Sequence, residues 1–173
     1  MSVQDLSPSP YVSLEGEARW FGDSLLEFLV PGSATGGKLF VFRGTFRRGF
    51  SPPRHAHTRE DEVFHVLDGE ASFDIDGERR SAGPGASVYV PLGVPHTFVV
   101  ESPVAVLLGI MAPAHFEHLF RSLSRPAAER TLPPPGAGLL DVEAVIATQE
   151  SLGTHVVGPP MSPEKDGPAG RYA

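Results

Sequence analysis

Short apolar segments separated by turn signals fill the middle of this chain, and this spacing limits the folds open to it. Between residues 38 and 111 the segments are rich in β-branched and aromatic residues, and turn signals recur every 8–12 residues. The pattern predicts an all-β sandwich or jelly roll of short antiparallel strands. No segment repeats another, so we expect one barrel. The expected strands cover residues 18–21, 25–30, 38–46, 62–67, 71–75, 78–81, 87–90, 96–101 and 104–111.

Two Asp-Gly dipeptides give the strongest hairpin signals in this region. Asp68-Gly69 follows the segment 62–67, and Asp76-Gly77 follows the segment 71–75. Asp-Gly favours the tight turn whose twist matches paired strands. We therefore expect two successive hairpins there.

A cluster of metal-binding residue types lies on these expected strands and on a further short strand that we expect to begin after Pro52 and Pro53. His55 and His57 are two residues apart, so on a strand both imidazoles project to the same face. Glu62 begins the next apolar run, which we interpret as the antiparallel neighbour whose carboxylate meets the imidazoles across the ladder. His96 begins a later strand after a Pro-x-Gly turn. Three imidazoles and one carboxylate predict a site for a transition-metal ion.

Simpler interpretations of these residues exist. An isolated His-x-His pair in a β protein is more often a surface pair than a site. Glu60 and Asp61 compete with Glu62 as the oxygen ligand. Strand parity turns Asp61 away from the face of Glu62, whereas Glu60 shares that face if the strand has already begun.

The spacing of these residues resembles the two sequence motifs of the cupin superfamily. Gly49-x5-His55-x-His57-x4-Glu62-x6-Gly69 matches the first motif, which favours Glu62 as the ligand. Gly85-x5-Pro91-x-Gly93-x2-His96 matches the second motif. Many cupins carry Asn four residues after that histidine, where this chain has Val100. The resemblance implies a double-stranded β-helix and carries over the ligands His55, His57, Glu62 and His96.

Within that superfamily the chain resembles small single-domain bacterial cupins similar to quercetin 2,3-dioxygenase. The resemblance is carried by EDEVFHVLDGEASFDIDGE, AGPGASVYVPLGVPHTF and APAHFEHLFRSL, together with WFGDSLLEFLVPGSATGG ahead of them. It implies a dioxygenase that binds a flavonol through its 3-hydroxyl and 4-carbonyl, with Glu62 taking the hydroxyl proton and O2 cleaving the heterocycle. It also implies a homodimer. A metal-dependent cyclase or isomerase without O2, and a non-catalytic binding cupin, are the alternatives.

The donor set narrows the cofactor to one divalent transition-metal ion. Three neutral imidazoles and one carboxylate leave a net charge of about +1 on such an ion, and an octahedral ion keeps two open positions. This favours Fe, Ni, Co, Mn or Cu for catalysis, whereas a tetrahedral Zn would be close to saturated. Glu62 can act as a proton acceptor beside the ion.

Strand parity also predicts the wall of a substrate pocket. Phe64 and Val66 share the face of Glu62, and Phe98 and Val100 share that of His96. These residues are either plain core or an apolar pocket wall, and a small barrel interior can be both. An apolar wall suits a hydrophobic aromatic molecule better than a sugar phosphate.

Composition excludes several classes of partner. The chain has a formal net charge of −7, which argues against nucleic acid and anionic membranes as partners. It has no cysteine, so only N and O atoms are available as metal ligands. The start, MSVQDLSPSP, lacks a secretion signal, and no apolar run reaches the length of a membrane helix. We expect a cytoplasmic protein.

The expected domain organisation is one cupin domain between two loose ends. Residues 1–10 are expected to be mobile, residues 11–157 to form the domain, and residues 158–173 to form a flexible tail. Within the domain the barrel covers about 11–112, and a helical extension of about two helices covers about 113–157. The first helix is indicated by apolar residues at helical spacing, and the second by an apolar stripe with Asp141 as N-cap and Gly153 just after its end.

Other polar residues have simple interpretations. His65 points away from the face of Glu62, and His115 and His118 fit the polar edge of the first helix. Trp20 and Phe21 are most simply core, although a role in stacking on the substrate stays open. The arginines of the region can attract an anionic substrate or can be solvated strand residues; they are Arg43, Arg47, Arg48 and Arg54.

Overall fold

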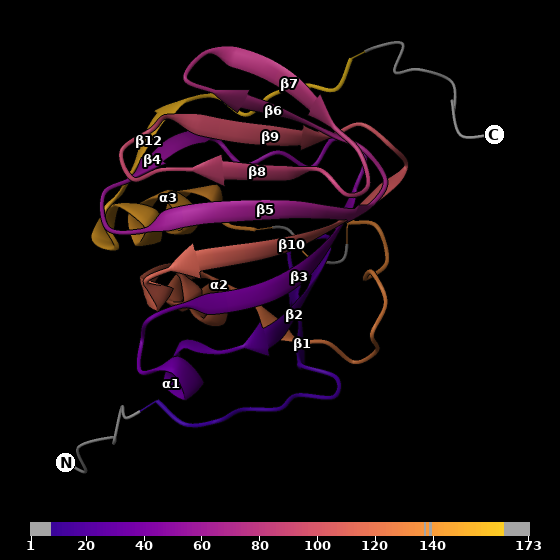
Figure 1. Cartoon of the computed structure of the whole chain (residues 1–173). Coiled ribbons are helices and arrows are strands. Elements are labelled where there is room, and N and C mark those ends of the chain that lie inside the picture. The colour runs from indigo at the N-terminus through magenta and orange to yellow at the C-terminus, as the bar shows by residue number, and fades with distance from the viewer. Residues whose placement is uncertain (1–7, 137, 139, 165–173) are drawn as a thin grey trace.

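Two antiparallel β-sheets form the body of the protein. The computed structural model describes residues 8–136, 138 and 140–164. The larger sheet has seven strands, in the order β11 (Arg125–Pro126), β1 (Glu17–Phe21), β2 (Ser24–Val30), β3 (Phe40–Arg47), β10 (Val104–Ala112), β5 (Asp61–Asp68) and β8 (Ser87–Val90). The smaller has five, in the order β12 (Thr154–Gly158), β4 (Arg54–His57), β9 (His96–Val100), β6 (Ala71–Ile75) and β7 (Glu78–Ala82). Figure 1 shows their arrangement, and the predicted all-β jelly-roll class is confirmed.

The hydrophobic core lies between the two sheets. Burial alternates along β5 and β10, so every second side chain faces inward, as the period of a half-buried strand requires. Phe64, Phe73 and Phe98 come from β5, β6 and β9, and their ring centroids lie 5.3–5.5 Å apart. These rings tie the sheets together, and truncating one of them to alanine should cost about 3–5 kcal/mol of stability.

The first predicted hairpin is wrong. β5 pairs with β8 and β10, whereas β6 pairs with β7 and β9 in the other sheet. The chain therefore crosses between sheets at Gly69. This residue has φ +74°, and a Cβ there would lie 2.3 Å from the carbonyl oxygen of Val104. A positive-φ glycine serves a crossover as well as a hairpin, so the local signal could not distinguish them.

The second predicted hairpin is confirmed. β6 and β7 pair in register across Asp76 and Gly77, both of which have positive φ. Positive φ at both central residues is the geometry that an Asp-Gly turn favours.

Four short helical segments accompany the sheets in the part of the chain that the structure describes. They are α1 (Gly32–Thr35), the 3-10 turn η1 (Ala114–Phe116), α2 (Glu117–Leu123) and α3 (Val142–Ser151). Asp141 caps α3 by accepting a hydrogen bond of 3.1 Å from the amide of Ala144, and Gly153 follows its end with φ +85°, as expected. No helix within the described residues is long and apolar enough to cross a membrane.

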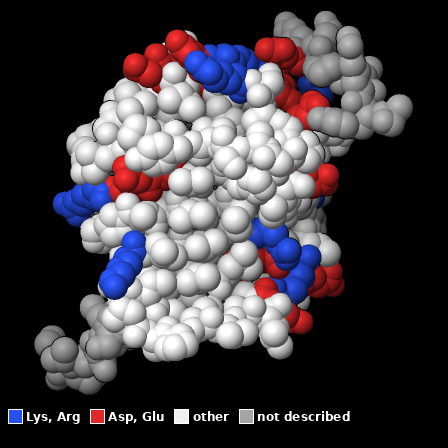
Figure 2. All heavy atoms as spheres, in the orientation of Figure 1, with Lys and Arg blue, Asp and Glu red and all other residues white. Residues whose placement is uncertain are grey.

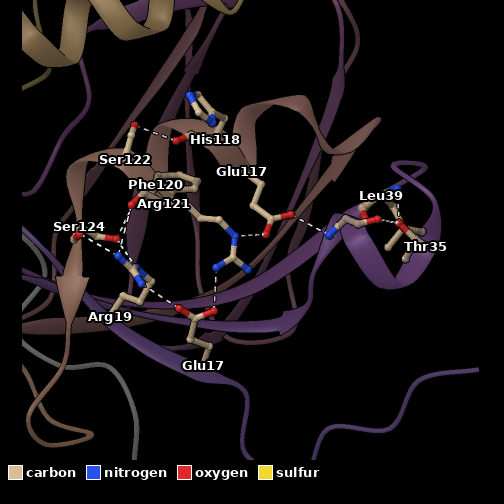
Figure 3. A network of polar contacts seen from close by, with 11 residues as sticks. Glu17, Arg19, Thr35, Leu39, Glu117, His118, Phe120, Arg121, Ser122 and Ser124 are labelled. Carbon is tan, nitrogen blue, oxygen red and sulfur yellow. Dashed lines mark hydrogen bonds and ion pairs between the residues drawn. The ribbon is translucent and has the colours of Figure 1, made fainter. Parts of the chain in front are cut away.

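Packing and ion pairs hold α2 against the barrel. Phe120 contacts Phe21 and Phe42, with ring centroids 5.4 and 5.1 Å apart. The buried Glu117 accepts a hydrogen bond of 2.7 Å from the amide of Gly32 and pairs with Arg121 at 2.6 Å (Figure 3). Arg121 also reaches Glu17 of β1 at 2.8 Å. These charge-assisted contacts fix α2 as one wall of the barrel opening.

The expected boundaries differ from the structure at the C-terminal side. The segment expected to be helical also contains β11 and β12, and β12 adds a strand beside β4. Within the expected tail, the amide of Met161 donates to the hydroxyl of Ser51 at 2.9 Å, and the amide of Glu164 donates to Glu101 at 3.1 Å. Residues 1–7 of the expected mobile start and residues 165–173 of the expected tail lie outside the described residues.

Candidate metal centre

Two neighbouring strands bring the three histidines together. His55 on β4 and His96 on β9 are directly opposite one another, and His57 lies two residues further along β4 on the same face. The imidazole centroids lie 4.4 Å apart for His55 and His96, 4.9 Å for His55 and His57, and 5.4 Å for His57 and His96. The strand register alone therefore brings the rings into one group.

Glu62 approaches this group from the opposite sheet. We expected its strand to pair with the histidine strand, but β5 does not pair with β4, and the carboxylate crosses the barrel interior instead. Its Oε2 lies 3.0 Å from Nε2 of His96 and 3.4 Å from Nε2 of His57. One donor atom from each of the four buried residues lies within 4.8 Å of the others. The cluster thus bridges the two sheets.

The outer nitrogen of each imidazole has a partner in the protein. Nδ1 of His55 lies 2.7 Å from the carbonyl of Pro53, and Nδ1 of His96 lies 2.9 Å from that of Val94. Nδ1 of His57 lies 3.0 Å from the hydroxyl of Thr154 on β12. Such contacts fix the orientation of ligating imidazoles and leave Nε2 for the metal.

The contacts within the cluster fit a bound cation. A carbonyl only accepts hydrogen bonds, so Nδ1 of His96 is the donor to Val94, and in the neutral ring Nε2 carries a lone pair. That lone pair would face a carboxylate oxygen at 3.0 Å, which is favourable when a proton or a metal ion lies between them. Nε2 of His57 is buried and has no hydrogen-bond partner among the described residues. Four buried N and O donors therefore form a site that can hold a metal ion.

Burial and the neighbouring charges set the protonation of this cluster. Burial lowers the pKa of His55 to about 3, assisted by the rings of His96 and His57, so this ligand is neutral at ordinary pH. Burial also lowers the pKa of His57, but Glu60 and Glu62 outweigh it and raise the value to about 9. Burial raises the pKa of Glu62, but the hydrogen bonds and charges of His57 and His96 outweigh this effect. They hold the pKa of the carboxyl group well below its usual range, so the carboxylate is ionised.

Metal binding should consequently depend on pH. In the metal-free protein His57 holds a proton below a pKa of about 9, and the metal must displace it. Between about pH 7 and that pKa the apparent metal affinity should rise up to about tenfold per pH unit, with about one proton released per ion. Competition titration against a chromophoric chelator and calorimetry in several buffers measure both quantities. An affinity that does not change over this range would contradict the assignment of the proton to His57.

The structure separates the three acidic candidates. Glu60 is fully buried behind His57, with its Oε1 3.4 Å from Nδ1 on the side away from Glu62. Asp61 turns outward and accepts a hydrogen bond of 2.8 Å from the amide of Leu92. The carboxylate that lies among the imidazole Nε2 atoms is that of Glu62.

Thr154 orients His57, and its role can be tested with an isosteric change. Thr154→Val keeps the shape of this fully buried side chain but removes the hydroxyl at Nδ1. Loss of such an outer partner typically costs about 10–100-fold in metal affinity, and we expect that range here. Thr148→Val is the matched control, because the hydroxyl of Thr148 bonds the carbonyl of Ala144 within α3. Equal metal affinities of the two variants would exclude this role.

A cavity of about 310 Å³ opens onto the candidate metal site, the group of His55, His57, Glu62 and His96, through the side chains of His55 and Glu62. Its walls are largely aromatic and aliphatic, and it has the size of sites that take small molecules. It is lined by Phe21, Leu26, Phe42, Phe46, Phe50, Ser51, Pro52, Pro53, His55, Glu62, Phe64, Phe98, Phe116, Leu119, Phe120, Leu140, Val142, Val145, Ile146, Gln149 and Pro160.

The four expected pocket residues divide between the cavity and the core. Phe64 and Phe98 line the cavity. Val66 and Val100 are completely buried in the hydrophobic core and are not among the lining residues. Strand parity gives the face of a side chain but not its depth, and both valines lie two residues further along their strands than these phenylalanines.

Sequence reasoning missed the contribution of the helical segments to the site. Phe116 of η1 packs edge-on against His57, with ring centroids 4.7 Å apart. Gln149 on α3 is buried and lines the cavity. The sequence did contain a signal for this residue. Gln149 is polar, yet it lies seven positions after Val142, on the face of the helix that carries the apolar stripe.

The other histidines and the four arginines considered above are exposed or contact residues outside the cluster. His65 faces outward and contacts the hydroxyl of Ser87, and the side chains of His115, His118 and His155 are exposed. Of the four arginines, Arg43 pairs with Glu27 and Arg54 with Asp74. Arg47 and Arg48 donate to the backbone carbonyls of Pro133 and Glu164. The cavity lining contains no arginine from the described residues.

A jelly roll whose two sheets enclose three histidines and one glutamate is the arrangement that defines the cupin class. Residues 42–120 match the family model described as a cupin domain. Together with the fold and the motif residues, this match supports the cupin superfamily.

Known proteins support the same class. Quercetin 2,3-dioxygenase of Bacillus subtilis is 28% identical over 153 residues, which cover 87% of this chain but 45% of that protein. A solved RmlC-like cupin from Shewanella frigidimarina is 25% identical and superposes with a TM-score of 0.56, covering 64% of this chain and 96% of that one. KdgF from Halomonas sp. superposes with a TM-score of 0.54 at 20% identity, covering 62% and 94%, and shows a shared fold.

Proposed function

We propose that this protein is a metal-dependent dioxygenase acting on a flavonol-like or other aromatic, polyketide-type small molecule. The observation that supports this most directly is the position of the His55, His57, Glu62 and His96 cluster at the wall of a cavity rich in phenylalanine. The similarity to the Bacillus subtilis protein named quercetin 2,3-dioxygenase favours a flavonol among such molecules.

The four donors suit a divalent Fe, Ni, Co, Mn or Cu ion, and Zn can also bind them. When bound, such an ion would supply Lewis acidity and open positions for substrate and O2, because four protein ligands leave two sites of an octahedron free. The chain's own residues would bind and orient the substrate. The aromatic walls would hold the ring system and exclude water, with Phe64 and Phe98 in contact and Val66 and Val100 behind them.

Glu62 is the residue we assign to proton transfer. Its carboxylate is ionised and lines the cavity, so it can accept the proton of a substrate hydroxyl placed beside it. With a flavonol the proton would come from the 3-hydroxyl, and addition of O2 would open the heterocycle and release carbon monoxide. One molecule of O2 would be consumed for each molecule of carbon monoxide formed.

The test begins with protein purified without chelator. Elemental analysis identifies the bound metal, and protein reloaded with each candidate ion is then supplied with quercetin. We expect O2 uptake and carbon monoxide release in equal amounts. Absence of turnover with every metal would remove the flavonol assignment. Conversion of a polyketide phenol without O2 uptake would favour a cyclase or isomerase, and tight binding without conversion would favour a binding protein.

We also propose that the protein is a homodimer that associates through the outer face of the larger sheet. Val41, Ile110, Val63 and Tyr89 lie side by side across β3, β10, β5 and β8. Tyr89 is 58% exposed, and the other three are partly exposed. Figure 2 shows a broad uncharged area on this face, with charged side chains towards its edges. An exposed row of apolar side chains within an uncharged area is typical of a protein interface.

A charge placed in this row should separate the subunits. Ile110→Glu puts two carboxylates into a self-complementary contact, and we expect analytical ultracentrifugation to show a monomer where the wild type is a dimer. Val157→Glu is the control, because Val157 is 54% exposed on β12 of the other sheet. A wild-type monomer, or a dimer that survives Ile110→Glu, would contradict the proposal.

The cytoplasmic location stays a prediction from the sequence.

A further inference from the structure

One polar side chain in the cavity wall has no role in the site described so far. Among the described residues, the lining contains four hydrogen-bonding side chains, Ser51, His55, Glu62 and Gln149. His55 and Glu62 belong to the metal cluster, and the hydroxyl of Ser51 accepts from the amide of Met161 at 2.9 Å. Gln149 is 3% exposed, and its Oε1 has no hydrogen-bond partner among the described residues.

The position of Gln149 on α3 places it towards the metal cluster. Val142, Val145, Ile146 and Gln149 follow the spacing of one helix face, and all four line the cavity. Along this face the side chains are more buried towards the end of the helix, from Val142, which is 62% exposed, to Gln149, which is 3% exposed. Five residues after Gln149, Thr154 contacts His57. Gln149 is therefore the last cavity-lining residue of α3 before the chain reaches the metal cluster.

A buried glutamine at this position is unfavourable unless its side-chain amide binds a ligand. The other α3 residues on this face are aliphatic, and a buried amide oxygen that accepts no hydrogen bond is unfavourable. A ligand with a polar group at this point would satisfy the amide. The amide can donate from Nε2 to a carbonyl or phenolate oxygen, and it can accept at Oε1 from a hydroxyl.

We propose that Gln149 binds the polar head of the substrate and selects molecules with an oxygen-bearing head and an apolar aromatic body. The inference rests on the proposed function, because it takes the ligand to be held at the metal cluster through oxygen atoms. The head lies between the cluster and Gln149, and the body packs on the phenylalanines and on the aliphatic residues of α3. A molecule that lacks the head leaves the amide unpaired and binds less tightly.

Two ligands of similar shape distinguish binding of the oxygen-bearing head from binding of the aromatic body. One is 3-hydroxyflavone, and the other is 2-phenylnaphthalene, which keeps the ring body but has no oxygen. Binding of each is measured by fluorescence to Ni-loaded protein without O2, so that open metal positions are present but nothing turns over. Gln149→Met retains the length of the side chain but removes both hydrogen-bonding groups, and Gln149→Leu serves as a second variant. Ile146→Leu is the control on the same helix face.

The expected result is a selective loss of affinity. Gln149→Met should weaken 3-hydroxyflavone binding about tenfold, the value of one hydrogen bond in a buried site, and should leave 2-phenylnaphthalene binding within about twofold. Ile146→Leu should change both ligands by similar factors, and all variants should keep one metal per chain.

Four outcomes would overturn the inference. Unchanged 3-hydroxyflavone binding in both Gln149 variants, or equal weakening of the two ligands, would contradict a contact with the head. Loss of metal in both variants would show that Gln149 supports the cluster instead. Failure of the wild-type protein to bind 3-hydroxyflavone would contradict the proposed flavonol-type substrate. Normal wild-type binding that the Gln149 variants do not alter would contradict only the Gln149 contact.

Discussion

Replacement of His57 by alanine is expected to abolish metal binding and turnover together. The change deletes one of the four donors and leaves only His55, Glu62 and His96 to hold the ion. Loss of an outer partner alone typically costs about 10–100-fold in metal affinity, so loss of a ligand should exceed about 100-fold. Metal content by elemental analysis and turnover with the same preparation measure the two effects.

His65→Ala is the matched control for this experiment. His65 lies on β5, faces outward and contacts Ser87, so its removal should leave one metal per chain. His57 also packs against Phe116, and circular dichroism should establish that the alanine variant is folded. A folded His57→Ala protein that turns over substrate without bound metal would contradict the proposed mechanism.

Glu62→Gln is expected to lower turnover far more than metal content. The amide oxygen can still coordinate an ion weakly, but the amide cannot accept a proton at neutral pH. A positioned general base typically contributes about 10²–10⁴-fold to a rate, and kcat should fall within that range. The measurement is kcat per bound metal, with metal content determined on the same sample.

The neighbouring carboxylate provides the comparison that makes this test specific. Glu60 is buried, but it lies on the Nδ1 side of His57, away from the cavity. Glu60→Gln should therefore reduce kcat per bound metal less than about tenfold, below the usual contribution of a general base. A larger effect from Glu60→Gln than from Glu62→Gln would transfer the role of base to Glu60.

Local sequence patterns predicted the individual donors because strand parity and spacing are local properties. His55, His57 and His96 lie on predicted strands with the predicted facing, and they converge with Glu62 in the structure. Parity could not show which sheet each strand joins. The Asp68-Gly69 signal was interpreted as a hairpin, although the chain crosses there to the other sheet, because the same glycine conformation serves both connections.

The turn at Asp76-Gly77 and the capping of α3 were determined by residues close together in sequence, whose geometry short-range sterics and hydrogen bonding fix. The spacing within each motif indicated the four candidate ligands, but the pairing of β4 with β9 and the packing of the two sheets brought them together. The tertiary structure decided the rest. It brought Thr154 to His57 and Gln149 to the cavity wall, and it placed Val66 and Val100 in the core. These contacts join segments far apart in the chain, and they depend on how the sheets and helices pack, which the spacing of residues within one segment does not specify.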